Sequence, residues 1–142
     1  MRNFLAAWAK YLFTRNMTPM LKITALEGGI LISLREVMRR LGDPVAASWS
    51  LKELDIISGS PLIGNVFELE ERSRSPQGVI MTQDQFMNFA TLDFQLSDGI
   101  VEGVDCQTQG GFLRMTCVDS SLWEIETNVG GLLEHIKKNR SG

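Results

Sequence analysis

The strongest constraint on the fold is a period-two alternation of apolar and polar side chains over residues 92–126. Turn-forming residues interrupt it at 98–99, 109–111 and 119–121. Because successive side chains of a strand point to opposite faces, this pattern predicts three or four consecutive antiparallel strands with one buried and one solvated face. The apolar positions expected to be buried together are Phe94, Leu96, Met115, Trp123 and Ile125.

The first half of the chain favours helices. Residues 3–14 place apolar side chains at helical spacing, and a second helix is expected over 19–41, with Thr18 as its N-cap and Pro19 at its first position. Paired glycines at 28–29 weaken a helix interior, so residues 20–27 are also compatible with a short strand.

The middle of the chain predicts shorter elements. Ser50 and Glu53 form a capping-box pattern that predicts a helix over 51–57. A strand over 62–71 and a mobile polar loop over 72–78 follow. A second capping box, Thr82 with Gln85, predicts a helix through about Ala90.

Together these elements predict an α+β fold in one domain spanning residues 1–142. A helical N-terminal half packs on an antiparallel β-meander, formed by about residues 62–71 and 92–126, and a C-terminal helix over about 129–138 completes it. A length of 142 residues suits a single domain, and 44% apolar with 22% charged residues is typical of a folded chain.

The two cysteines, Cys106 and Cys117, are expected to be buried free thiols. In the simplest hairpin register Cys117 faces Val101 and Cys106 faces Phe112, which separates the cysteines by on the order of 16 Å along the strands. A disulfide requires Cα atoms within about 7 Å. Reduced thiols fit a cytoplasmic location.

Neither a membrane segment nor a targeting peptide is expected. The apolar stretch at 4–9 is interrupted by Lys10, which makes it shorter than the core of a signal peptide, and no run approaches the length of a membrane span. An amphipathic helix accounts better for Phe4, Leu5 and Trp8.

No constellation of residues predicts catalysis. The lone histidine, His135, has no nucleophile or substrate-positioning group spaced to work with it. The carboxylates at 68–71, and Glu124 with Glu126, are explained by solvated surfaces better than by a metal site. We therefore predict no catalytic residue, no metal ligand and no cofactor, and an enzyme is the least favoured hypothesis.

Nucleic acid is not an expected partner. The net charge is −3, and the arginines at 35, 39 and 40 fit the solvated face of an amphipathic helix.

A protein surface is the expected partner instead. Aromatic side chains are concentrated in the N-terminal helix, and Phe13 falls outside its main apolar stripe. Aromatic residues are enriched in interfaces, so we expect a homodimer whose interface includes Phe4, Trp8, Tyr11 and Phe13. The chain is then a non-catalytic interaction or accessory module. The alternative is a small-molecule binder with an apolar pocket between sheet and helices.

Overall fold

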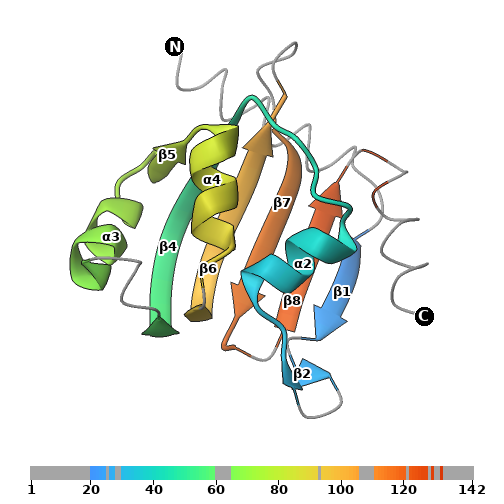
Figure 1. The fold of residues 1–142 in the computed structure, drawn as a ribbon, viewed down its shortest axis with the longest axis horizontal. Helices are drawn as coiled ribbons and strands as arrows, with labels where there is room; N and C mark the ends of the chain where they lie inside the picture. The colour runs from blue at the N-terminus through green and yellow to red at the C-terminus, as the bar shows by residue number, and fades with distance from the viewer. Residues whose placement is uncertain are drawn as a thin grey trace.

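A computed structural model of the chain describes residues 20–24, 26–27, 30–59, 65–92, 94–105, 111–120, 122–127, 129 and 132 (Figure 1). The elements in chain order are β1 (Met20–Thr24), β2 (Leu26–Glu27), β3 (Ile30–Leu31), α2 (Leu34–Arg40), β4 (Ser48–Gly59), α3 (Val66–Ser73), β5 (Val79–Met81), α4 (Gln83–Ala90), β6 (Phe94–Val104), β7 (Gly111–Val118) and β8 (Leu122–Thr127).

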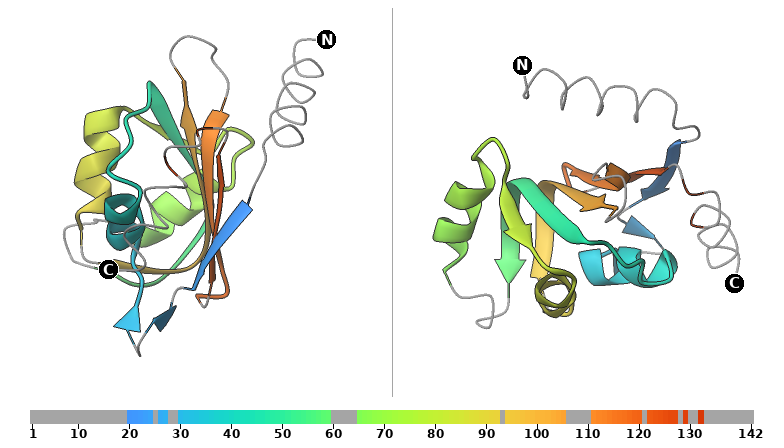
Figure 2. Two further views of the ribbon diagram at one scale, coloured as in Figure 1. Left: turned by 90° about the vertical axis from the view of Figure 1, so that its right-hand side faces the viewer. Right: turned by 90° about the horizontal axis from the view of Figure 1, so that it is seen from above.

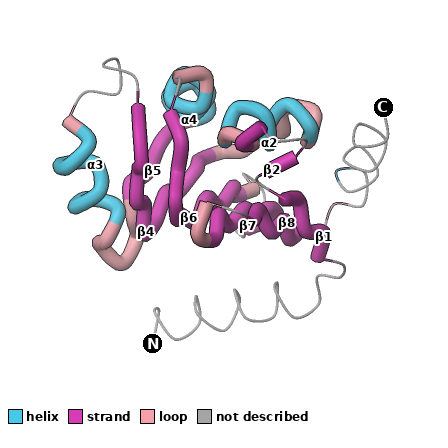
Figure 3. Tube along the Cα trace, turned by 90° about the horizontal axis from the view of Figure 1, so that it is seen from below, coloured by secondary structure: helices cyan, strands magenta, loops and turns pink. Residues whose placement is uncertain are grey.

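The strands form a six-stranded antiparallel sheet in the order β1-β8-β7-β6-β4-β5, and β2 with β3 forms a separate two-stranded pair. Helices α2 and α4 lie on the same side of the sheet, whereas α3 lies beside β4 (Figures 2 and 3). The predicted α+β class is therefore confirmed.

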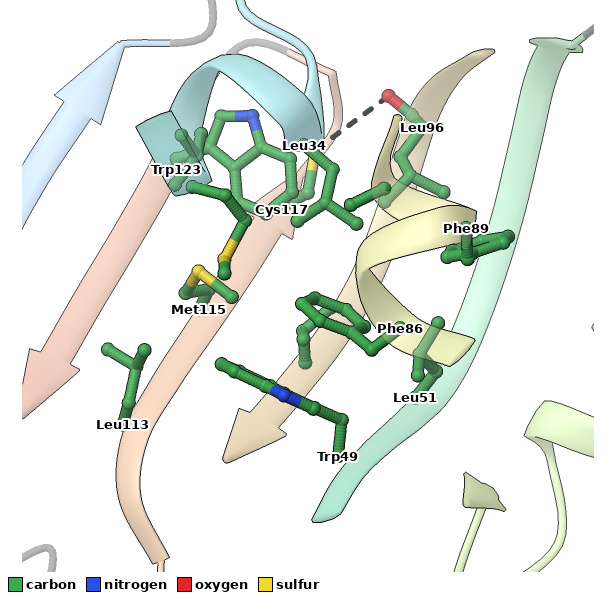
Figure 4. Close-up of a cluster of buried hydrophobic side chains, with 14 of the residues drawn as sticks. Leu34, Trp49, Leu51, Phe86, Phe89, Leu96, Leu113, Met115, Cys117 and Trp123 are labelled. Carbon is green, nitrogen blue, oxygen red and sulfur yellow. Dashed lines mark hydrogen bonds between the residues drawn. The ribbon is translucent and has the colours of Figure 1, made fainter. Parts of the chain in front are cut away.

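We call the side under α2 and α4 the covered face. It is apolar, and its residues join those of the two helices in one buried cluster (Figure 4). Phe94, Leu96, Met115, Trp123 and Ile125 are all buried in that cluster, as the alternation predicts. The strand residues of this face include Trp49, Leu51, Leu54, Val101, Leu113 and Cys117.

Two buried tryptophans of the sheet form hydrogen bonds with the layer that covers it. Trp49 stacks on Phe86 with ring centroids 4.2 Å apart, and its Nε1 donates to the Oε1 of Gln83 at 2.7 Å. Trp123 Nε1 donates to the backbone oxygen of Ile32 at 3.0 Å. A buried indole N–H without an acceptor costs free energy, so these bonds fix α4 and the residues preceding α2 against the sheet.

The alternation in β4 shifts at a β-bulge. Lys52 pairs with Ile100 and Asp55 with Asp98, so Glu53 and Leu54 together oppose Gly99. Glu53 has φ 52, a left-handed conformation that suits the extra residue of a bulge. A Cβ on Gly99 would lie 2.9 Å from Cδ2 of Leu54, so the glycine leaves room for that side chain.

The same irregularity explains why the helix expected over 51–57 is wrong. The bulge brings Leu51 and Leu54 to one face at a spacing of three, which imitates helical periodicity. Ser50 does not cap a helix, because its hydroxyl donates to the backbone oxygen of Gln77 at 2.7 Å. Long-range pairing of β4 with β5 and β6 overrides the local capping pattern.

In β6 a second irregularity replaces an expected turn. Leu96 pairs with Ile56 and Asp98 with Asp55, which leaves Ser97 as an extra residue. The strand therefore continues through Asp98 and Gly99, and the hairpin turn predicted there is wrong. The buried positions change from even to odd numbers across this point, which in the sequence resembles two strands joined by a turn.

The strand expected over 62–71 is also wrong where the structure describes it, because residues 66–73 form α3. Asn65 caps this helix by accepting from the backbone N–H of Glu68 at 3.0 Å. Phe67, an apolar residue of this stretch, is exposed rather than buried. The expected loop over 72–78 begins at the end of α3 and leads into β5, a strand that the sequence did not predict.

The helix expected over 19–41 is confirmed only in its second part. Residues 20–24 form β1, paired with β8, and Ser33 caps α2 by accepting from the N–H of Glu36. The strand alternative for 20–27 therefore holds. The helix expected after Thr82 is confirmed as α4, with both bonds of the capping box present.

Two predicted helices, over 3–14 and over 129–138, lie outside the described residues, apart from residues 129 and 132 of the second. The hairpin register is shifted by two residues, since Cys117 pairs with Gly99 rather than Val101. Cys117 is a buried free cysteine as predicted, and Cys106 lies outside the described residues.

Candidate functional site

The face of the sheet opposite α2 and α4, which we call the open face, carries the polar half of the alternation. Cross-strand pairing aligns Ser50, Glu102, Arg114 and Glu126 in one row from β4 to β8. The row continues to Ile80 of β5 and Met20 of β1 at the two edges. A parallel row holds Lys52, Ile100, Thr116 and Glu124.

At the centre of the open face, Glu102 links two cations on neighbouring strands. Its Oε1 lies 3.3 Å from Lys52 Nζ, and its Oε2 lies 3.5 Å from Arg114 Nη2. The side chains of Glu102 and Lys52 are 13% and 19% exposed, so water screens this pair less than it screens a typical surface ion pair. The cluster fixes charged groups in the middle of the face, with one carboxylate shared between two cations.

Apolar side chains accompany these charges. Ile100 and Leu122 are partly buried, and Ile80 and Val118 are exposed. A mixture of apolar side chains and paired charges resembles the surface of non-obligate protein interfaces, which are about as apolar as the rest of a protein surface. The open face is therefore neither a continuous apolar patch nor a uniformly charged surface.

Helix α3 closes part of the outer edge of β4, next to the short strand β5. Ser73 Oγ accepts from the backbone N–H of Leu54 at 3.0 Å, and Glu70 Oε2 accepts from that of Ile56 at 2.8 Å. Arg74 pairs with Asp55 at 2.7 Å. Side chains thus satisfy strand donors that would otherwise be available to pair with another chain.

Two large apolar side chains are exposed near the junction of β4 and α3. Ile57 is 58% exposed and Phe67 is 70% exposed. Isolated exposed apolar residues are common on protein surfaces and need no functional explanation. Because Phe67 is an exposed aromatic residue of α3, its substitution can serve as a control for substitutions of other aromatic residues.

The thiol of Cys117 is protected rather than reactive. Burial, assisted by the negative charge of Asp98, raises its pKa from 9.0 to about 11. Its Sγ donates weakly to the backbone oxygen of Leu96 at 3.7 Å (Figure 4). Because the thiolate is the nucleophilic form, this environment suppresses nucleophilic chemistry at Cys117.

The other charged residues considered from the sequence fall on separate surfaces. Glu36 forms hydrogen bonds with Arg39 and Arg40 within α2, which lower its pKa from 4.5 to about 2 despite partial desolvation. Glu68, Glu70 and Glu71 lie on α3 rather than on a strand. Glu124 and Glu126 do share a sheet face, as expected.

Within the described part of the chain, no group of three or more metal-binding side chains comes together. No helix there combines the length and apolar character needed to cross a bilayer. His135 and the predicted interface residues Phe4, Trp8, Tyr11 and Phe13 lie outside the described residues.

The open-face cluster of Lys52, Glu102 and Arg114 was not predicted from the sequence. The capping-box pattern predicts a helix at Lys52, and the pairing of β4 with β6 joins residues about fifty positions apart in the sequence. The alternation around Arg114 does predict that this residue lies on a polar face of the sheet. Local patterns do not predict which residues of other strands lie beside it.

Comparison with known proteins gives no match to a family model, a curated protein or a solved structure.

Proposed function

We propose that the chain is a non-catalytic protein-interaction module that acts as a homodimer, with its N-terminal segment in or beside the interface. The observation that supports this most is the asymmetry of the sheet: described helices cover one face, while the opposite face carries ordered ion pairs and apolar side chains. Strand β1, at the edge of the sheet, begins at Met20, directly after this segment in the sequence.

Residues 4–13 supply the apolar surface for this contact. The stripe of Phe4, Trp8 and Tyr11 can cover one side of its own subunit, which leaves Phe13 directed elsewhere. Burying an aromatic side chain contributes roughly 1.5–3 kcal/mol. A two-fold axis uses the same patch twice and thereby covers this residue in both subunits.

The space between sheet and helices supports a small-ligand site less well. Among the described residues this layer is filled by packed side chains, including the stacked rings of Trp49 and Phe86 (Figure 4). A ligand there would have to displace core residues, so the interaction module is the better-supported function.

Light scattering at micromolar concentration tests the proposal. We expect the full chain to have twice its 15.9 kDa chain mass, and Phe13→Ser to shift it toward the monomer. The matched control is Phe67→Ser, which alters an exposed aromatic of α3 and should leave the dimer intact. A full-length mass of one chain would refute the proposed dimer. A dimer that dissociates in Phe67→Ser but persists in Phe13→Ser would move the interface to α3.

A further inference from the structure

Helix α3 is attached to the sheet differently from α2 and α4. Each of those two helices buries three apolar residues: Leu34, Val37 and Met38 in α2, and Phe86, Phe89 and Ala90 in α4. Within the described helix α3, Ser73 is the one residue that is buried, and Leu69 packs against the core while partly exposed. Burial of apolar area is the main contribution to docking, so α3 is the least firmly anchored of the described helices.

Polar contacts with the outer edge of β4 hold α3 in place (Figure 1). The hydroxyl of Ser73 donates to the backbone oxygen of Glu70 at 2.6 Å and accepts from the N–H of Leu54 at 3.0 Å. The carboxylate of Glu70 accepts from the N–H of Ile56 at 2.8 Å. Alternate N–H groups of a strand point to the same edge, so these two oxygens replace the carbonyl oxygens of a neighbouring strand.

The remaining contacts of α3 add little to its docking. Arg74, directly after the helix, pairs with Asp55 at 2.7 Å, but the two side chains are 41% and 50% exposed. Ion pairs as exposed as this one contribute little to stability. A helix of eight residues is also too short to be stable alone in water, so α3 unfolds when its contacts with β4 are lost.

Strand β5 defines where such an opening ends. It pairs with residues 49–51 of β4, and Val79 is buried in the core. A Cβ on Gly78 would lie 2.5 Å from the backbone oxygen of Leu51, so the backbone here packs tightly against β4. Helix α3 and the turn after it can therefore leave the edge of β4 while β5 stays paired.

We propose that α3 is a guard helix, which opens as a unit from the edge of β4 while the rest of the sheet stays folded. Segments with few buried apolar contacts open at a lower free energy than the core. In the closed state the N–H groups of Leu54 and Ile56 are bonded to α3, and in the open state this part of the strand edge is unpaired. The inference does not rest on the proposed dimer, because it concerns contacts within one chain.

Hydrogen exchange of backbone amides, followed by NMR at low denaturant concentrations, tests the opening in the unaltered chain. We expect Leu54 and Ile56 to exchange on the order of a hundredfold faster than residues 100–102 of β6, which are paired on both sides. Denaturant should change the rates at Leu54 and Ile56 little, because a local opening exposes little surface, and should increase those in β6 steeply. Equal rates with equal denaturant dependence would overturn the proposal.

Glu70→Ala tests whether the helix opens as a unit. Loss of this acceptor should accelerate exchange about tenfold at Ile56, and equally at Leu54 and at Leu69 within α3. The matched control is Glu71→Ala, which alters the neighbouring exposed glutamate and should leave all three rates unchanged. Glu70→Gln keeps an oxygen acceptor and should give rates between those of Glu70→Ala and the unaltered chain. Acceleration confined to Ile56, or equal acceleration in the two alanine variants, would overturn the proposal.

Discussion

The covered and open faces of the sheet are built by the same strands but hold very different side chains. On the covered face, residues such as Trp49, Met115 and Trp123 are fully buried. On the open face, Lys52, Glu102 and Arg114 retain partial exposure and are held by ion pairs. Burial of apolar area is the larger free-energy contribution, while ion pairs that remain partly hydrated contribute less.

The comparison teaches that the buried apolar contacts lie on one face of the sheet and the partly hydrated ion pairs on the other. Each bulge in β4 and β6 changes which positions of the strand face the core. Leu54 and Val101 are buried on the covered face despite this change. Removing covered-face groups should therefore unfold the domain, whereas altering open-face groups should change contacts with modest loss of stability.

The largest effect is expected for Trp49→Ala. This change removes the stack on Phe86 and leaves a cavity in the core, so the free energy of unfolding should fall by about 3–5 kcal/mol. Chemical denaturation followed by circular dichroism measures it. Thr116→Ala on the open face is the control and should cost less than about 1 kcal/mol. Similar losses in both variants would contradict the division between faces.

A large difference is also expected in thiol reactivity. At pH 8 the raised pKa of Cys117, about 11 instead of 9.0, lowers its thiolate fraction by about a hundredfold. The variant Thr116→Cys places a thiol on the open face at the neighbouring position. Iodoacetamide labelling mapped by mass spectrometry should modify residue 116 far faster than Cys117. Equal rates at the two positions would show that the faces are not distinguished as described.

A smaller effect is expected from the open-face ion pair. In a double-mutant cycle with Lys52→Met and Glu102→Gln, the coupling free energy should be about 0.5–1.5 kcal/mol, because the pair is partly but not completely shielded from water. Raising the salt concentration should reduce the coupling. A coupling near zero would mean that the cluster does not order the open face.

The smallest effect is expected at Glu36 of α2, on the solvent side of the covering layer. Its pKa is lowered from 4.5 to about 2, chiefly by its hydrogen bond to Arg39, so the folded state favours the ionised form. Its contribution to stability is complete above pH 4.5 and is lost as the pH falls toward 2. The difference in unfolding free energy between the unaltered chain and Glu36→Gln should shrink over that interval. A difference independent of pH would contradict the assigned ion pairing.

Local patterns in the sequence predicted regular parts of the fold. The alternation of Leu113, Met115 and Cys117 predicted β7, and Thr82 with Gln85 predicted α4, because in both cases the local preference agrees with the tertiary structure. For the same reason, the alternation correctly predicted that Trp123 and Ile125 are buried in the core.

The predictions are wrong where contacts between residues far apart in the sequence determine the local structure. The capping-box pattern of Ser50 and Glu53 predicts a helix where β4 instead pairs with β5 and β6. The bulge opposite Gly99 depends on the partner strand, which local patterns do not contain. Glu102 and Lys52 could not be paired before β4 was known to be a strand beside β6. For the open face, the sequence predicted that Glu124 and Glu126 share one side of the sheet, but it did not predict the ion cluster of Lys52, Glu102 and Arg114.

Carboxyl labelling tests most directly the central claim that the open face is a contact surface. A carbodiimide and an amine probe modify accessible carboxylates, and mass spectrometry resolves Glu126 on the open face from Glu68 and Glu71 on α3. The full chain is compared with a chain that begins at Met20. The account predicts that labelling of Glu126 rises several-fold when residues 1–19 are absent, while labelling of Glu68 and Glu71 stays the same. Unchanged labelling of Glu126 in a folded truncated chain would contradict it.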